Sequence, residues 1–129
     1  MDKIRRFEDL DVFQRARELC KKIYTITDTE PFRHDLRFAQ QIRAAAGSVM
    51  DNIAEGYERN GNKEFVNFLY IAKGSCGEVR SQLIRANDVR FIDDTTFQQL
   101  YDEALEVGRK IYYLSEAIRR TGNPGNKYQ

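Results

Sequence analysis

Apolar residues recur along most of this chain at intervals of three and four, which is the period of one face of an α-helix. Four stretches have this pattern, at about residues 9–27, 33–58, 63–88 and 95–120. No stretch shows the strict alternation of a half-buried strand. The predicted buried faces consist of Val12, Ala16, Leu19, Cys20, Ile23 and Ile26 in the first stretch; Ile42, Ala46, Val49 and Ile53 in the second; Phe65, Phe68, Ala72, Cys76, Val79, Leu83 and Ala86 in the third; and Phe97, Leu100, Ala104, Val107, Ile111, Leu114 and Ile118 in the fourth.

The breaks between these stretches fall at residues that end or begin helices. Pro31 pushes the residue before it out of the helical region, and Asn-Gly-Asn at 60–62 suits a left-handed turn. We expect side-chain caps at Asp9, at the last residue of that turn, and at Asp94 or Thr95. Short connections between long amphipathic helices make neighbours antiparallel. The chain therefore predicts an all-α fold, an antiparallel up-down-up-down four-helix bundle.

Length and composition fit one globular domain. The chain has 129 residues, of which 41% are hydrophobic and 32% charged, enough for one core and too few for two. We expect an N-terminal arm at residues 1–8, a bundle domain at 9–121 and a mobile polar tail at 122–129. The sequence has no apolar leader and no apolar run of about 18 residues, so we expect a cytoplasmic protein without a membrane segment.

Small residues in two of the predicted helices indicate a close helix contact. Gly74 and Gly77 interrupt the third helix, each at a cost of about 1 kcal/mol relative to alanine. A glycine inside a helix often accommodates a neighbouring backbone, and Ala-Ala-Ala-Gly-Ser at 44–48 of the second helix is a suitable partner. We expect the second and third helices to pack closely at these residues.

A line of polar residues runs beside the apolar face of the second helix, about 100° round the helix axis. The third helix repeats this pattern, so both helices would engage polar as well as apolar neighbours. The two lines could form a functional cluster, or a structural network in which arginine and amide donors satisfy buried or subunit-facing carboxylates. The lack of a nearby nucleophile favours the structural alternative. The network or subunit interface is expected to contain Asn52, Glu55, Glu78 and Arg85, beside Gln41, Ser48, Arg59, Asn67, Gly74 and Ser81.

The residues needed for common catalytic sites are missing from the sequence. A di-iron bundle needs Glu-x-x-His on two helices, but His34 is the single histidine and falls in a loop or first turn. Ser48 and Ser75 have no histidine base at helical spacing. Cys20 and Cys76 lie on apolar faces, which is typical of free buried thiols. We expect no enzyme activity, no metal and no cofactor.

The charge of the chain is nearly balanced, with 21 Lys and Arg against 20 Asp and Glu, so no overall field attracts nucleic acid. Local basic residues around the second predicted helix could still bind RNA, and a ring of subunits would multiply a modest patch. An ordinary solvated surface is the other interpretation. The candidates for RNA binding are Arg37, Arg43, Arg59, Lys63 and Lys73.

Several motifs resemble a known family. They are Leu-Asp-Val-Phe-Gln at 10–14, Gln-Ile-Arg at 41–43, Asn-Ile-Ala-Glu-Gly at 52–56, Lys-Glu-Phe at 63–65 and Ile-Ala-Lys-Gly-Ser at 71–75. Together they make the chain similar to the 23S rRNA intervening-sequence proteins over nearly its whole length. The resemblance implies a left-handed four-helix bundle that assembles into rings, typically homopentamers, in a family without an established biochemical role.

These observations lead to two functional hypotheses. The first is a non-enzymatic, ring-forming scaffold whose ligand is RNA. The alternative is an oligomeric adaptor whose apolar or tyrosine-lined surface docks a partner protein. RNA affinity that falls steeply with salt would favour the first hypothesis, and a stoichiometric protein partner that survives nuclease treatment would favour the second.

Overall fold

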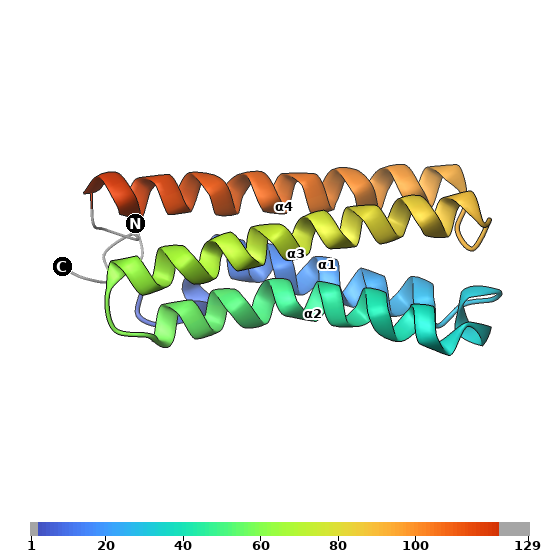
Figure 1. The fold of residues 1–129 in the computed structure, drawn as a ribbon, viewed down its shortest axis with the longest axis horizontal. Helices are drawn as coiled ribbons and strands as arrows, with labels where there is room; N and C mark the ends of the chain where they lie inside the picture. Colours follow the sequence, from blue (N-terminus) through green and yellow to red (C-terminus); the bar gives the residue numbers. More distant parts are fainter. Residues whose placement is uncertain (1–2, 122–129) are drawn as a thin grey trace.

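Four long helices lie side by side, and each runs antiparallel to the next along the chain (Figure 1). The computed structural model describes residues 3–121. This confirms the predicted all-α four-helix fold, and the described residues contain no strand. The left-handed sense of the bundle stays a prediction, and the predicted tail at 122–129 lies outside the described residues. The helices are α1 (Asp11–Thr27), α2 (Leu36–Glu58), α3 (Asn62–Asp88) and α4 (Asp94–Thr121), with short 3-10 turns at Phe7–Asp9 and Phe32–His34.

The core lies along the centre of the bundle and receives side chains from all four helices. Ile23, Ile53, Leu69 and Ile111 are fully buried, one from each helix. Helix α3 packs against α2 on one flank and α4 on the other, and α1 closes the bundle between α2 and α4. Most residues of the four predicted apolar faces are buried. The exceptions are half-buried: Cys20, Ile26, Phe68, Phe97 and Leu114.

The first helix begins later than its predicted cap. Asp9 does not cap α1, because the 3-10 turn at Phe7–Asp9 comes between, and Leu10 precedes the helix without a side-chain cap. The Asp9 carboxylate instead accepts a hydrogen bond from the backbone N–H of Arg5 at 3.0 Å. That bond lowers the pKa of Asp9 below its ordinary value.

The other helix starts also differ from the sequence prediction by one to three residues. Helix α2 begins after Asp35, whose carboxylate accepts from the backbone N–H of Phe38 at 3.1 Å. Helix α4 is capped by Asp93, not by Asp94 or Thr95, because Asp93 accepts from the N–H of Thr96 at 2.7 Å. That hydrogen bond also lowers the pKa of Asp93. An aspartate that precedes a helix by one residue can reach the free N–H groups of its first turn, whereas one inside the turn cannot.

Two turns set the length of α3. At its start, Gly61 has φ 106°, a conformation that favours glycine, and Asn62 is the first helical residue rather than the cap. At its end, Arg90 has φ 64° and donates its N–H to Asn87 O, while Phe91 donates to Ala86 O at 2.8 Å. This is the Schellman arrangement, here with arginine at the left-handed position.

The contact between α2 and α3 includes small residues, as predicted, but it does not require the predicted glycines. Ser48 lies against Ser75 across the two helices. A Cβ added to Gly47 or Gly74 would meet nothing within 4 Å, and one on Gly77 would meet only the end of an arginine side chain. The tight approach is at Gly56, where an added Cβ would lie 2.6 Å from Phe68 Cβ, so glycine is required near the α2–α3 turn.

Candidate nucleic-acid interface

The five basic residues predicted to bind RNA lie on separate surfaces. Arg37 is exposed on the first turn of α2, at the end of the bundle opposite the α2–α3 turn. Arg43 lies between α1 and α2, and Arg59 directly follows α2. Lys63 and Lys73 are exposed on α3 and each lines a hollow between α3 and α4. The structure does not form one basic strip along α2.

Two of these arginines are engaged inside the protein. Arg43 donates from Nε to Thr27 Oγ1 at 2.7 Å, and its guanidinium stacks 4.7 Å from the ring centroid of Tyr24. Arg59 donates to a Glu55 carboxylate oxygen at 2.7 Å and lies over the Phe68 ring. The hydrogen bond to Glu55 raises the pKa of Arg59. Both arginines thus hold neighbouring segments together, which supports a structural role.

At the centre of the contact between α3 and α2, polar side chains form hydrogen bonds with one another. Ser48 Oγ and Ser75 Oγ lie 2.9 Å apart across the helix contact. Asn52 donates from Nδ2 to the backbone oxygen of Ser48 at 2.8 Å and to its Oγ at 2.9 Å. Asn52 is therefore part of a small hydrogen-bonded network between α2 and α3.

The remaining predicted network residues form separate local pairs. Glu55 binds Arg59, as described above, and Glu78 accepts from Gln82 Nε2 at 3.1 Å. Arg85 donates to Gln41 Oε1 at 3.2 Å and stacks over the Phe38 ring at 4.2 Å. Asn52, Glu55, Glu78 and Arg85 each have a partner within the chain, but the structure does not gather them into one cluster.

The flank of α3 that faces α4 has a different chemistry. A groove between the two helices is lined by Lys73 and Arg80 from α3 and by Leu105, Arg109 and Tyr112 from α4; we call it the α3/α4 groove. Its floor is formed by Cys76 and Gly108, since a Cβ on Gly108 would lie 3.5 Å from Cys76 Cβ. The groove combines cations, an exposed tyrosine and an apolar floor.

Most cations on this flank have no carboxylate partner. Within residues 3–121, no carboxylate lies within 4.0 Å of the side-chain nitrogens of Lys63, Lys73 or Arg80. Arg80 donates to the Tyr101 hydroxyl at 3.3 Å, but its Nε is buried without an acceptor. Arg109 is paired with Glu106 at 3.4 Å. Of the five cations on this flank, Arg80 is engaged with Tyr101, and Arg109 and Arg119 are paired with glutamates. Lys63 and Lys73 have no carboxylate partner among the described residues, so these two lysines carry positive charge that no ion pair neutralises.

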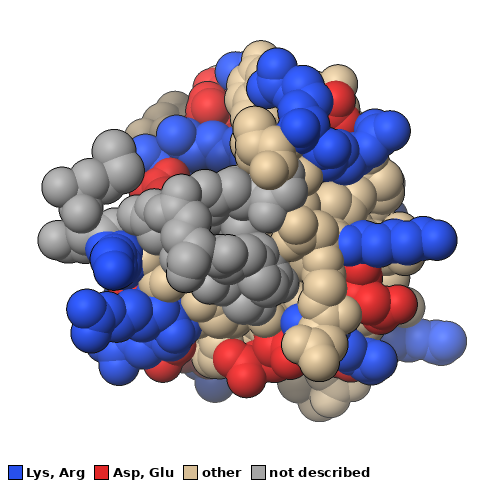
Figure 2. Space-filling view, turned by 90° about the vertical axis from the view of Figure 1, so that its left-hand side faces the viewer, with Lys and Arg blue, Asp and Glu red and all other residues tan. Residues whose placement is uncertain are grey.

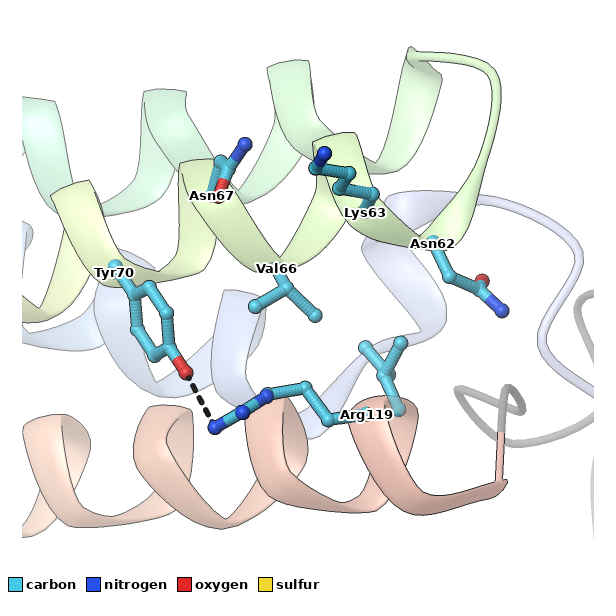
Figure 3. Close-up of a pocket in the computed structure, with 7 residues that line it drawn as sticks. Asn62, Lys63, Val66, Asn67, Tyr70 and Arg119 are labelled. Atoms are coloured by element: carbon cyan, nitrogen blue, oxygen red, sulfur yellow. Dashed lines mark hydrogen bonds between the residues drawn. The ribbon is translucent and has the colours of Figure 1, made fainter.

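A second hollow continues along the same two helices toward the α2–α3 turn. Its lining includes Lys63, Val66, Asn67 and Tyr70 from α3 and Arg119 from α4; we call it the end pocket (Figure 3). Arg119 donates to the Tyr70 hydroxyl at 3.3 Å across the gap, and this bond raises the pKa of Arg119. In Figure 3, Lys63 and Asn67 project from the α3 side, away from α4. Arg119 also binds Glu116 at 3.1 Å.

The end of the bundle at the α2–α3 turn carries charges of both signs. Figure 2 shows this end, where lysine and arginine side chains are more prominent than aspartate and glutamate. Arg59 there is paired with Glu55, and Arg6 with Asp9.

The arrangement of titratable groups offers no catalytic centre within the described residues. Burial raises the pKa of the Cys76 thiol to about 12, so it is a thiol and not a nucleophile near neutral pH. His34 is exposed and lies 2.9 Å from Glu30, and no group of three metal-ligating residues occurs between residues 3 and 121. None of the described helices is long and apolar enough to cross a membrane. A cytoplasmic location stays a prediction.

Arg80, Arg109 and Arg119 were not among the residues predicted from the sequence. Tyr101, Tyr112 and Arg119 stand eleven and seven residues apart, which places them along one side of their helix. Lys63 and Tyr70, seven residues apart, share a side of α3, whereas Arg80 lies about 100° round the helix from Lys63. This spacing is visible in the sequence. Its link to a binding site becomes clear only when the structure shows that α3 and α4 border the same groove.

The fold and its surfaces define a four-helix-bundle protein with a groove between α3 and α4 that is lined by cations and a tyrosine. The chain belongs to the 23S rRNA-intervening sequence protein family, whose model matches residues 8–113. The fold is also similar to the crystal structure of a protein of unknown function from the S23 ribosomal protein family of Bacteroides thetaiotaomicron VPI-5482. That comparison has a TM-score of 0.75 at 18% identity and covers 81% of this chain and 98% of the other. Comparison with curated proteins gives no match.

Proposed function

We propose that this protein is a non-enzymatic, ring-forming scaffold that binds RNA through the α3/α4 groove. The observation that carries the proposal is a pair of exposed lysines without carboxylate partners, Lys73 in the α3/α4 groove and Lys63 in the adjoining end pocket, beside exposed tyrosines on the same flank. Cations without internal carboxylate partners can pair with phosphates at little cost, because no existing ion pair has to be broken.

Assembly into a ring, as a homopentamer or another closed homo-oligomer, forms the second part of the proposal. The outer surface of α2 and α3 supports it, because Ile71 is 52% exposed there and Gly47 and Gly74 leave room for a neighbouring helix. A subunit contact at this surface would leave the α3/α4 groove open. Repeating the groove around a ring would then strengthen binding to a long RNA by increasing the effective concentration of sites.

RNA binding is tested by fluorescence anisotropy with a labelled RNA over a range of salt. For about three phosphate contacts, affinity should fall about 20- to 40-fold between about 50 and 200 mM salt. Lys73→Gln should weaken binding and reduce the slope of log K against log salt by about 0.7 to 0.9. Lys21→Gln is the matched control, since Lys21 is an exposed lysine on α1 paired with Glu18. Binding that is absent, or independent of salt, would contradict the proposal.

Ring formation is tested separately by light scattering. The wild-type protein should have the mass of a closed oligomer at micromolar concentration, and Ile71→Glu should lower that mass while the helical content is retained. Ile84→Glu is the control, because Ile84 is a comparably exposed isoleucine (45%) elsewhere on α3. A wild-type protein that is strictly monomeric would contradict the ring.

One observation favours the adaptor as a second candidate function. At the opposite end of the bundle, Phe38, Val89 and Phe91 line a hollow beside Arg85, and Leu36 nearby in sequence is 68% exposed. An apolar hollow with a cation at its edge can dock an acidic amphipathic segment of a partner protein. Affinity purification after nuclease treatment tests this alternative. A single stoichiometric partner lost in Val89→Glu would support the adaptor, and no retained partner would contradict it.

A further inference from the structure

We infer that the end pocket holds an unpaired base, so that the RNA bound by this protein is single-stranded at that point. This inference rests on the proposed function, because it specifies the kind of RNA. It uses the pocket formed by Lys63, Val66, Asn67, Tyr70 and Arg119, which the general RNA proposal does not require.

Tyr70 is placed as a stacking platform. Its ring is 41% exposed, and its hydroxyl is held by Arg119 from the opposite helix at 3.3 Å. Figure 3 shows the ring standing in the gap between α3 and α4, with Val66 beside it on α3. A tyrosine fixed at its hydroxyl loses little freedom when a base stacks on its face. Base–aromatic stacking needs a base that is not already stacked in a duplex.

The polar groups of the pocket match the rest of a nucleotide. Arg119 presents a guanidinium beside the ring and is also bound to Glu116 at 3.1 Å. Lys63 lines the α3 side of the pocket with an exposed ammonium that has no carboxylate partner among the described residues and can pair with a phosphate oxygen. The exposed amide of Asn67 has a donor and an acceptor for a base edge. The stacking face thus lies in the gap between the helices, and Lys63 and Asn67 border it on the α3 side (Figure 3).

The position of the pocket favours an RNA strand that continues from it along the α3/α4 groove. From Lys63 to Arg80 the cations of α3 extend over about 25 Å at the helical rise of 1.5 Å per residue. Tyr70 and Tyr112 lie between the cations, and Tyr112 is 43% exposed. Alternating cations and aromatic rings in a groove are typical of single-strand binding, whereas a duplex is recognised through its shape and backbone.

The test compares a single-stranded RNA of about 12 nucleotides, a length within the usual site sizes, with the same strand in a duplex. The wild-type protein should bind the single strand about tenfold more tightly or better. Tyr70→Ala should weaken single-strand binding about tenfold with an unchanged salt slope, because stacking releases no counterions. Tyr70→Phe should retain most of the affinity. Lys63→Gln should instead reduce the slope by about 0.7.

Tyr24→Ala is the matched control, because Tyr24 is an exposed tyrosine (49%) on the opposite side of the bundle. Thermal unfolding of each variant separates loss of stacking from loss of the fold, and Tyr70→Phe preserves the ring if Tyr70→Ala is unstable. Equal binding of duplex and single strand, or an unchanged affinity in Tyr70→Ala, would overturn this inference while leaving the proposed function intact. If neither RNA bound in a salt-dependent way, both this inference and the proposed function would be contradicted.

Discussion

The two flanks of α3 differ in how their polar groups are satisfied. Toward α2, hydroxyls and charges find partners within the chain, as in the pair Ser48–Ser75 and the pair Arg85–Gln41. Toward α4, Lys73 is exposed without a carboxylate partner among the described residues, and Tyr112 is exposed beside it. Groups that are matched internally stabilise the fold, whereas unmatched groups remain available to a ligand. One helix therefore has a structural flank and a candidate binding flank.

This difference explains why the polar residues singled out from the sequence were not the best functional candidates. Asn52 was predicted to lie in a polar network, and Arg43 was predicted to bind RNA. Both use their donors on neighbouring segments of the same chain, Asn52 on Ser48 and Arg43 on Thr27. A polar side chain at a contact between helices usually forms its hydrogen bonds within that contact, so it is not available to bind a ligand or take part in a reaction.

The largest expected effect concerns backbone spacing on the two flanks. Gly56→Ala should lower the free energy of unfolding by about 1–3 kcal/mol, because its Cβ would overlap Phe68 Cβ. Gly108→Ala, on the α4 side, should cost nothing and raise stability by up to about 1 kcal/mol, since its Cβ would make an ordinary contact with Cys76. Urea denaturation measures both. Equal destabilisation by the two substitutions would show that the flanks are equally tight.

A smaller effect is expected from the matched hydroxyls between α2 and α3. A double-mutant cycle with Ser48→Ala and Ser75→Ala should give a coupling free energy of about 0.5–1.5 kcal/mol, because the two oxygens share one hydrogen bond. RNA affinity should not change in either variant. A coupling energy near zero would show that the two hydroxyls do not stabilise each other. A loss of RNA binding would show that this flank belongs to the RNA-binding surface.

The smallest effect is a pH dependence from Cys76, which lies under the α3/α4 groove. Burial raises the pKa of this thiol from 9.0 to about 12, so between those values the folded state holds a proton that the unfolded state has lost. Stability should therefore decrease as the pH rises above the ordinary thiol pKa, by less than about 1 kcal/mol at about pH 9.5.

Comparing the wild-type protein with Cys76→Ala isolates this contribution, because the tyrosines and lysines that titrate in the same range are common to both. The difference in free energy of unfolding should decrease from about pH 7.5 to about pH 9.5. A difference independent of pH would indicate that water reaches the thiol, and that the floor of the groove is more open than its contacts suggest.

Much of the fold was predictable because helical periodicity is a local property. The buried positions Ile53, Val79 and Ile111 follow directly from spacing, as do the four helices. Helix ends were less predictable, since Asp9 and Asp94 are as suitable for capping as Asp93 until the position of the first helical turn is known. Gly61 was identifiable because a left-handed turn favours glycine, whereas Arg90 at φ 64° has no comparable signal.

For the candidate site, the residue types and their helical spacing followed from the sequence: a nearly neutral chain with lysines and tyrosines on helical faces. Which of these residues share a surface depended on how the helices pack. Tyr70 meets Arg119 because α3 and α4 pack antiparallel, which brings together residues 49 positions apart. Periodicity assigns a residue to a side of its own helix, but the neighbour on that side and the availability of each charge depend on packing.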